Sequence, residues 1–324
     1  MVSESSSSPA TARFPAATRA PHVCPITLRS RRRRGTYVAM RVTPTMQVAR
    51  HYYSAGRQAN RYVSAGRRRV PRSLTLSAVA AIPRAMARQL AIGSVRLSTS
   101  LPRIVAAGGE RELDALVAAT DADLVELRAD LFDDPRPASI VAALERLRTA
   151  GRPVILTVRA AAEGGRPLPD AVRRDLYRAG LVHADAIDVE IASTALASEL
   201  VAQAHAAGRT VLLSSHATEG TPPVDALLPL VDRAEAMGAD VTKLAATAHD
   251  LEDVRTMLAV TLAARHRGVV TVSMGPAGAL ARVLLPAAGS LLAYGHVGNP
   301  TAPGQLTVTE LAALVRRFFS FASS

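Results

Sequence analysis

From Leu101 onwards, short apolar runs alternate with amphipathic stretches. Eight runs rich in β-branched residues are predicted as strands. They cover residues 102–107, 123–128, 153–159, 185–190, 210–216, 239–245, 269–274 and 290–295. The stretches between them carry apolar residues at helical spacing, as at Leu113, Leu116 and Val117, and are predicted as helices. The chain thus repeats a strand-helix unit eight times.

Eight strand-helix units within residues 96–324 predict an α/β fold, a (β/α)8 or TIM barrel. An open, doubly wound sheet is the alternative. The glycine-rich loops that bind nucleotide phosphates, GxGxxG and GxxxxGK[ST], do not follow any predicted strand. The barrel is therefore the favoured architecture, with its chemistry expected at the carboxyl ends of the strands.

Composition places the chain among globular proteins, because 48% of its residues are apolar. The longest uncharged run, from Val283, is interrupted by Pro286 and Gly289, so no membrane span is expected. Cys24 is the only cysteine, which excludes disulfides within the chain and thiolate metal sites. A reducing compartment is compatible with this, and we expect a cytoplasmic protein.

The net charge of +12 is unevenly distributed. Residues 1–100 hold 18 arginines and one acid, Glu4, whereas residues 101–324 hold 21 basic and 26 acidic residues. Residues 1–95 are predicted to form a disordered, Arg/Ser-rich extension. Three alternatives stay open for it: sequence upstream of a true start such as Met86, an organelle targeting peptide, or an arm that binds nucleic acid.

Lys243 is the only lysine among 39 Lys and Arg residues. Arginine can replace a lysine wherever a solvated charge is sufficient, but its guanidinium group stays protonated. Lysine can lose its proton and attack a carbonyl to form a Schiff base. The alternative is that one lysine is present by chance in an arginine-rich composition and has no chemical role. The neighbouring sequence favours a chemical role.

Ionisable residues collect at the predicted carboxyl ends of the strands. They are Glu126, Arg128, Arg159, Glu163, Asp188, Glu190, His216, Lys243 and Arg282, with Thr301 and Gln305 after the last strand. Buried charges are costly unless they are paired, so their convergence on one rim indicates a site. Taken singly, Asp188 or Glu190 could pair with an arginine in a salt bridge that closes the barrel mouth, and His216 could be a core histidine whose ring nitrogens are hydrogen-bonded.

These residue types suit Schiff-base chemistry. Burial and a neighbouring arginine, Arg159 or Arg282, are expected to favour the neutral form of Lys243. The imine would acidify the adjacent carbon, and His216 could remove that proton. An arginine can hold a carboxylate and Glu126 can accept from hydroxyls, so the inferred substrate is a small hydroxylated keto acid.

The ordered motifs VELRAD, ILTVRAAAEGG, IDVE, SSH, GADVTKLA, TVSMG and TAPGQ resemble those of type I 3-dehydroquinate dehydratases. The resemblance covers residues 101–318. It implies a (β/α)8 barrel, commonly a homodimer, that needs no metal or cofactor. It also implies syn dehydration of 3-dehydroquinate to 3-dehydroshikimate through a lysine Schiff base, in the shikimate pathway leading to chorismate or in quinate breakdown.

The resemblance also implies residue roles. Lys243 matches the Schiff-base lysine, His216 the general base, and Glu163 the carboxylate that supports the histidine. The positions that match substrate-binding residues are Glu126, Leu127, Arg128, Arg159, Arg282, Thr301, Gln305 and Met274.

The chain departs from the family pattern at Ala106, Ala217 and Ala281, where the family usually has Ser, Asp and Ser, and Thr301 replaces a serine while keeping its hydroxyl. Because the nucleophile and base remain, we expect an active enzyme. The alternatives are a class I aldolase, a basic nucleic-acid-binding protein on a barrel scaffold, and a barrel that binds a ligand without catalysis.

Overall fold

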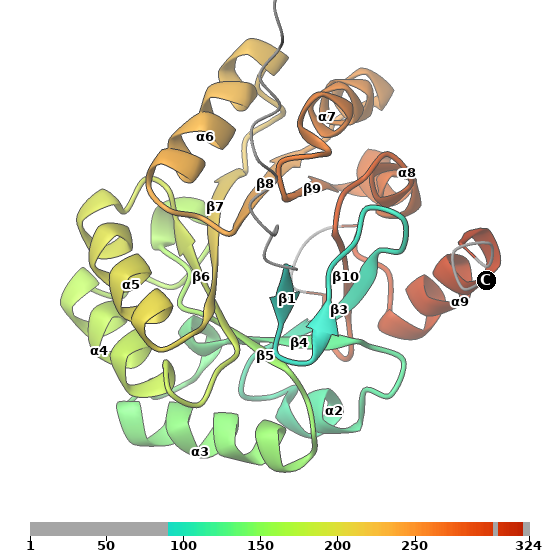
Figure 1. Cartoon of the computed structure of the whole chain (residues 1–324). Coiled ribbons are helices and arrows are strands. Elements are labelled where there is room, and N and C mark those ends of the chain that lie inside the picture. The colour runs from blue at the N-terminus through green and yellow to red at the C-terminus, as the bar shows by residue number, and fades with distance from the viewer. Residues whose placement is uncertain (1–89, 301–303, 320–324) are drawn as a thin grey trace, which may run out of the picture. The chain divides into compact units, whose positions relative to one another are not determined.

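The computed structural model of the chain describes residues 90–300 and 304–319 (Figure 1). The predicted extension, apart from its last six residues, lies outside the described residues, and so does Thr301. The expectations of disorder, targeting or nucleic-acid binding for the extension therefore stay predictions.

Eight parallel strands form one sheet that curves into a nearly closed barrel, in the order β10-β3-β4-β5-β6-β7-β8-β9. They are β3 (Arg103–Gly108), β4 (Leu124–Arg128), β5 (Val154–Thr157), β6 (Ala186–Glu190), β7 (Thr210–Ala217), β8 (Val241–Thr247), β9 (Val269–Met274) and β10 (Leu292–His296). Both ends of every strand lie within two residues of their predicted positions. The barrel is confirmed, and the open sheet is wrong.

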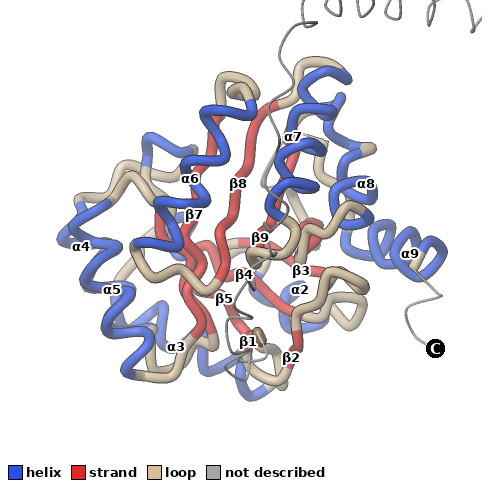
Figure 2. Tube along the Cα trace, turned by 45° about the horizontal axis from the view of Figure 1, so that its top comes forward, coloured by secondary structure: helices blue, strands red, loops and turns tan. Residues whose placement is uncertain are grey.

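Eight α-helices follow the strands and surround them (Figures 1 and 2). They are α2 (Leu113–Ala118), α3 (Pro137–Thr149), α4 (Asp170–Gly180), α5 (Thr194–Ala206), α6 (Val224–Ala236), α7 (Leu251–Ala264), α8 (Ala281–Ala287) and α9 (Val308–Phe318). Helix α7 begins after Asp250, whose carboxylate accepts from two free backbone N–H groups, and α9 begins with a Thr307–Glu310 capping box. Within the described ranges, no helix is both long and apolar enough to cross a membrane.

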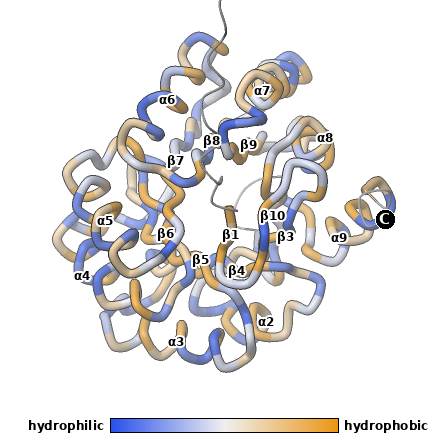
Figure 3. Tube along the Cα trace, in the orientation of Figure 1, coloured by the Kyte–Doolittle hydropathy of each residue, from blue (hydrophilic) through white to orange (hydrophobic). Residues whose placement is uncertain are grey.

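Side-chain alternation along the strands divides the apolar residues into two layers. On β3, Val105 and Ala107 pack inside the barrel, whereas Ile104 and Ala106 pack in the layer between strands and helices. Polar and apolar positions are interleaved along the helices, which bury only their inner faces (Figure 3). Ala106 therefore points away from the barrel interior, and Ala107 occupies the inward position.

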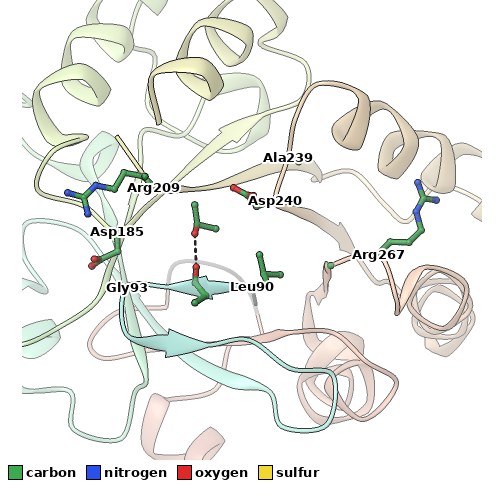
Figure 4. Close-up of a pocket in the computed structure, with 11 residues that line it drawn as sticks. Leu90, Gly93, Asp185, Arg209, Ala239, Asp240 and Arg267 are labelled. Carbon is green, nitrogen blue, oxygen red and sulfur yellow. Dashed lines mark hydrogen bonds between the residues drawn. The ribbon is translucent and has the colours of Figure 1, made fainter. Parts of the chain in front are cut away.

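A hairpin of β1 (Ala91–Ile92) and β2 (Val95–Arg96) lies at the amino ends of the strands. Ile92 is fully buried among the interior residues of the barrel, and the Thr210 hydroxyl donates to the Ala91 carbonyl over 2.6 Å. Figure 4 shows the pocket beside this hydrogen bond, lined by charged residues from the starts of several strands. The hairpin thus forms a plug that closes the amino end of the barrel. Because residues 90–95 belong to this plug, we propose that the barrel domain begins at about residue 90, earlier than the expected residue 96.

The barrel wall has one irregular junction, between β9 and β10, where the strands form no regular ladder. The Leu291 amide donates to the Val269 carbonyl over 3.0 Å, and the Thr271 amide donates to the buried Ser290 hydroxyl over 3.0 Å. A serine side chain thus replaces a missing backbone partner there.

The substitution Ile92→Ala tests the plug. It should lower the free energy of unfolding by about 2 to 4 kcal/mol, because it leaves a cavity at the closed end of the barrel. Chemical denaturation of the full chain measures this, with the exposed Arg96→Ala as the control. Equal stability of the two variants would show that the hairpin does not support the barrel.

Candidate active site

Lys243 lies in β8 and points into the carboxyl half of the barrel, where it is only 5% exposed. Its Nζ donates to Glu126 Oε2 over 3.0 Å and to Asp188 Oδ2 over 2.8 Å. The ring of Tyr294 lies under the same nitrogen, with its centroid 4.2 Å away. Two carboxylates and an aromatic face therefore fix the position of the amine.

Arg159 is buried on the other side of Asp188. Its guanidinium donates to Asp188 Oδ2 and Glu190 Oε1, each over 3.0 Å, and to the Ser214 hydroxyl over 2.7 Å. Burial alone would raise the pKa of the Asp188 carboxyl, but Arg159 and Lys243 outweigh it and hold that pKa well below its usual value. Asp188 thus remains a carboxylate between two cations.

Glu190 continues this network towards the helices. It also accepts from the Ala160 amide over 2.9 Å and from Arg173 of α4, which is itself buried and donates to the Val158 carbonyl over 3.0 Å. Asp188 and Glu190 both form salt bridges with Arg159, as the salt-bridge alternative predicted, and Asp188 also pairs with Lys243. Neither role could be assigned from the strand pattern alone.

His216 and Glu163 form the second part of the site. His216 Nδ1 and its backbone amide both lie 2.9 Å from Glu163 Oε2, and Glu163 is carried by the short 3-10 helix η4 (Ala161–Glu163) after β5. This contact occupies Nδ1 and leaves Nε2 for chemistry.

The two groups of this pair have shifted pKa values. Burial raises the pKa of Glu163 to about 7, and the nearby charges of Glu190 and Asp188 add to it against the opposing effect of Arg159. Burial, with the positive charges of Arg159 and Lys243, lowers the pKa of His216 well below its usual value. His216 is thus neutral near pH 7 and can act as a base.

Arg282 lies in α8, beyond the end of β9, and is 4% exposed. Neither its Nε nor its Nη2 has a hydrogen-bond partner in residues 90–300 and 304–319. Burial lowers the pKa of this guanidinium to about 10. An inward, uncompensated cation is suited to bind an anionic ligand, as a carboxylate would be.

The other predicted substrate-binding residues lie in different surroundings. Arg128 forms a two-pronged contact with Asp130 over 2.8 and 2.7 Å, so its guanidinium is held at the end of β4. Met274, at the end of β9, packs against the interior cluster that contains Tyr294, and Gln305 is half-buried before α9. Leu127 packs outward between strands and helices, which does not support a substrate contact by its side chain.

The structure also gives roles to residues that sequence reasoning left out. Asp130 and Ser214 hold the arginines, and Tyr294 contacts the lysine. Strand alternation could have indicated Tyr294, because it shares the inner face of β10 with Leu292. In the described residues, no group of three or more His, Cys, Asp or Glu side chains is arranged to hold a metal ion.

Comparisons with known proteins agree with this geometry. The model of the family described as type I 3-dehydroquinase matches residues 104–320. A 3-dehydroquinate dehydratase of Klebsiella pneumoniae is 37% identical over 203 residues, which cover 59% of this chain and 80% of the relative. One of Methanocella arvoryzae is 34% identical over 211 residues, 65% of this chain and 94% of the relative.

Solved structures give the same result. The crystal structure of 3-dehydroquinate dehydratase from Geobacillus kaustophilus is 26% identical and superposes with a TM-score of 0.65, covering 72% of this chain and 97% of that one. The enzyme from Aquifex aeolicus is 27% identical with a TM-score of 0.61, covering 67% and 99%. The chain therefore belongs to the type I 3-dehydroquinase family of hydro-lyase enzymes.

Proposed function

We propose that this chain dehydrates 3-dehydroquinate to 3-dehydroshikimate by syn elimination through an imine on Lys243. The observation that carries the proposal is a buried lysine whose Nζ lies 3.0 Å from Glu126 and 2.8 Å from Asp188, on the strand next to the one that carries the neutral His216. Family membership supports the substrate, and the residue geometry supports the mechanism.

Imine formation begins when the Lys243 ammonium gives a proton to the neighbouring Glu126 carboxylate, since Asp188 is held in its ionised form by two cations. The nitrogen lone pair then attacks the ketone carbon of the substrate, and the former carbonyl oxygen leaves as water. The resulting positively charged C=N bond accepts the electron pair released when the adjacent C–H bond breaks.

His216 is suited to take that proton on Nε2, because Glu163 accepts the Nδ1 proton and fixes the tautomer. The electron pair moves into the C=C bond of an enamine. The enamine then expels the β-hydroxyl group, which receives the proton that His216 carries and leaves as water. Because His216 removes the proton and protonates the leaving hydroxyl on the same face of the substrate, the elimination is syn. Hydrolysis of the imine releases the product.

Substrate binding is assigned to groups around the lysine. Arg282 takes the carboxylate, because its buried donors are otherwise unused among the described residues. Glu126 and Arg128 contact hydroxyl groups, and Met274 packs against the ring of the substrate. Arg159, whose guanidinium already holds Asp188 and Glu190, orients these groups. Thr301 and Gln305 complete the binding set by resemblance.

We propose that the enzyme serves the shikimate pathway and chorismate biosynthesis, in the cytoplasm and as a homodimer. Quinate breakdown uses the same reaction, and growth of a deletion strain without aromatic amino acids distinguishes the two. Sedimentation of the purified chain tests the dimer.

The covalent step can be trapped with borohydride. In the presence of 3-dehydroquinate, reduction should add the ligand to Lys243, and trypsin should then fail to cut there, leaving the peptide from residue 234 to Arg255 intact. Lys243→Arg, which keeps the charge between the two carboxylates, should give neither adduct nor turnover. An unmodified Lys243 in folded enzyme with excess substrate would exclude the imine mechanism.

The pH dependence can be tested at Glu163. Because the pKa of Glu163 is about 7, kcat/KM should fall as the pH drops through this value. A protonated Glu163 donates to Nδ1 and moves the histidine proton to Nε2, which blocks the base. Glu163→Gln should be slower and should lose this titration, since the amide does not ionise. The same apparent pKa in both proteins would assign the titration to another group.

Arg282 can be tested by Arg282→Met. KM should rise at least roughly tenfold, because one hydrogen bond to a charged group contributes about 1.5 to 3 kcal/mol. The melting temperature of the free enzyme should rise, since an uncompensated buried cation is removed. The exposed Arg255→Met is the control. An unchanged KM would place the carboxylate elsewhere.

A further inference from the structure

Tyr294 contacts Lys243 from β10, which is separated from the lysine's strand, β8, by β9. It lies on β10, is 6% exposed, and presents the face of its ring to Lys243 Nζ at 4.2 Å. Strand β3 lies between β10 and β4, with Val105 opposite Tyr294 and Ala107 opposite Glu126. The small Ala107 leaves the space beside the Tyr294 ring and the Glu126 carboxylate unblocked.

The hydroxyl group of Tyr294 is buried and has no partner with good hydrogen-bond geometry among the described residues. Its neighbour is the Glu126 carboxylate, which is near enough for a weak hydrogen bond. The donor is therefore poorly used in the free enzyme, and a buried donor of this kind calls for an explanation. A ligand oxygen that arrives with the substrate beside Glu126 provides one.

Tyr177 shows what a structural tyrosine looks like in the same molecule. It is fully buried, its hydroxyl donates to the Asp188 carbonyl over 2.5 Å, and it accepts from the Val158 amide over 2.9 Å. Its polar atom is satisfied by the backbone. Tyr294 is also buried, at 6% exposed, yet its hydroxyl has only the weak contact with Glu126.

Tyr294 also keeps its proton. Burial raises the pKa of its hydroxyl well above the usual value, and the negative charges of Glu126 and Asp188 raise it further. The group is thus a phenol throughout the working pH range and can donate a hydrogen bond.

We propose that Tyr294 is a catalytic residue whose hydroxyl donates to the oxygen on the carbon that Lys243 attacks. This oxygen is first the ketone oxygen and then the hydroxyl of the carbinolamine. The proposal rests on the imine mechanism given above and adds the donor that makes its oxygen leave.

The protons balance through the same three residues. Lys243 first gives one proton to Glu126, 3.0 Å away, and becomes a neutral amine. After attack, a second proton moves from nitrogen to the oxygen and gives the carbinolamine hydroxyl. Tyr294 then protonates this hydroxyl and regains its own proton from Glu126, while the C–O bond breaks and the nitrogen pair forms C=N. Water and a protonated imine result.

Tyr294→Phe is the test, because it removes the hydroxyl and keeps the ring under Lys243. Single-turnover mixing with 3-dehydroquinate, followed by quenching with borohydride, measures the rate of imine formation. We expect this rate to fall by at least roughly tenfold, the range for loss of one positioned donor. The melting temperature should stay close to that of the wild type, because only a weak contact with Glu126 is lost. Tyr177→Phe, the matched control, should melt lower.

The outcomes separate the two proposals. Imine formation at the wild-type rate in Tyr294→Phe overturns the role of Tyr294, and so does a melting temperature that falls as in Tyr177→Phe, since that marks a structural hydroxyl. If wild-type enzyme itself forms no imine, the proposed mechanism fails first. A slower imine step in a variant of undiminished stability supports Tyr294 as the donor.

Discussion

The cost of burying charge determines how the carboxyl half of this barrel is built. Glu190 is paired with Arg159 and Arg173, and Asp188 with Arg159 and Lys243, so each buried ion has an opposite partner. Removing one member would leave another uncompensated in a region with little solvent. The network that fixes the nucleophile is therefore also what makes the charged layer of the barrel stable.

Arg282 departs from this rule, because its Nε and Nη2 have no hydrogen-bond partner among the described residues. The hydroxyl of Tyr294, whose ring contacts Lys243, has only a weak contact with Glu126. A protein selected for stability alone would replace them with apolar residues. Their retention is the pattern expected when a site is complete only with its ligand. The hydrogen bonds that these donors lack in the free enzyme then form with the ligand and contribute to the free energy of binding.

Much of this arrangement was predictable from sequence, for physical reasons. Eight buried strands give apolar runs with sharp ends, and the ends of parallel strands meet on one rim, so Lys243, His216 and Glu126 could be placed together. The contacts behind them could not, because Arg173 lies on an amphipathic helix where an arginine normally points to solvent. Which of Ala106 and Ala107 faces the interior also required the structure, because a one-residue shift along a strand exchanges the inner and outer faces.

The irregular junction between β9 and β10 affects the mechanics of the site. Every other neighbouring pair of strands in the barrel is joined by a ladder, so the wall is most compliant here, where Ser290 supplies one of the cross-links. Helix α8, which carries Arg282, packs against both of these strands. The hydrogen bonds across this junction therefore also help to set where Arg282 lies.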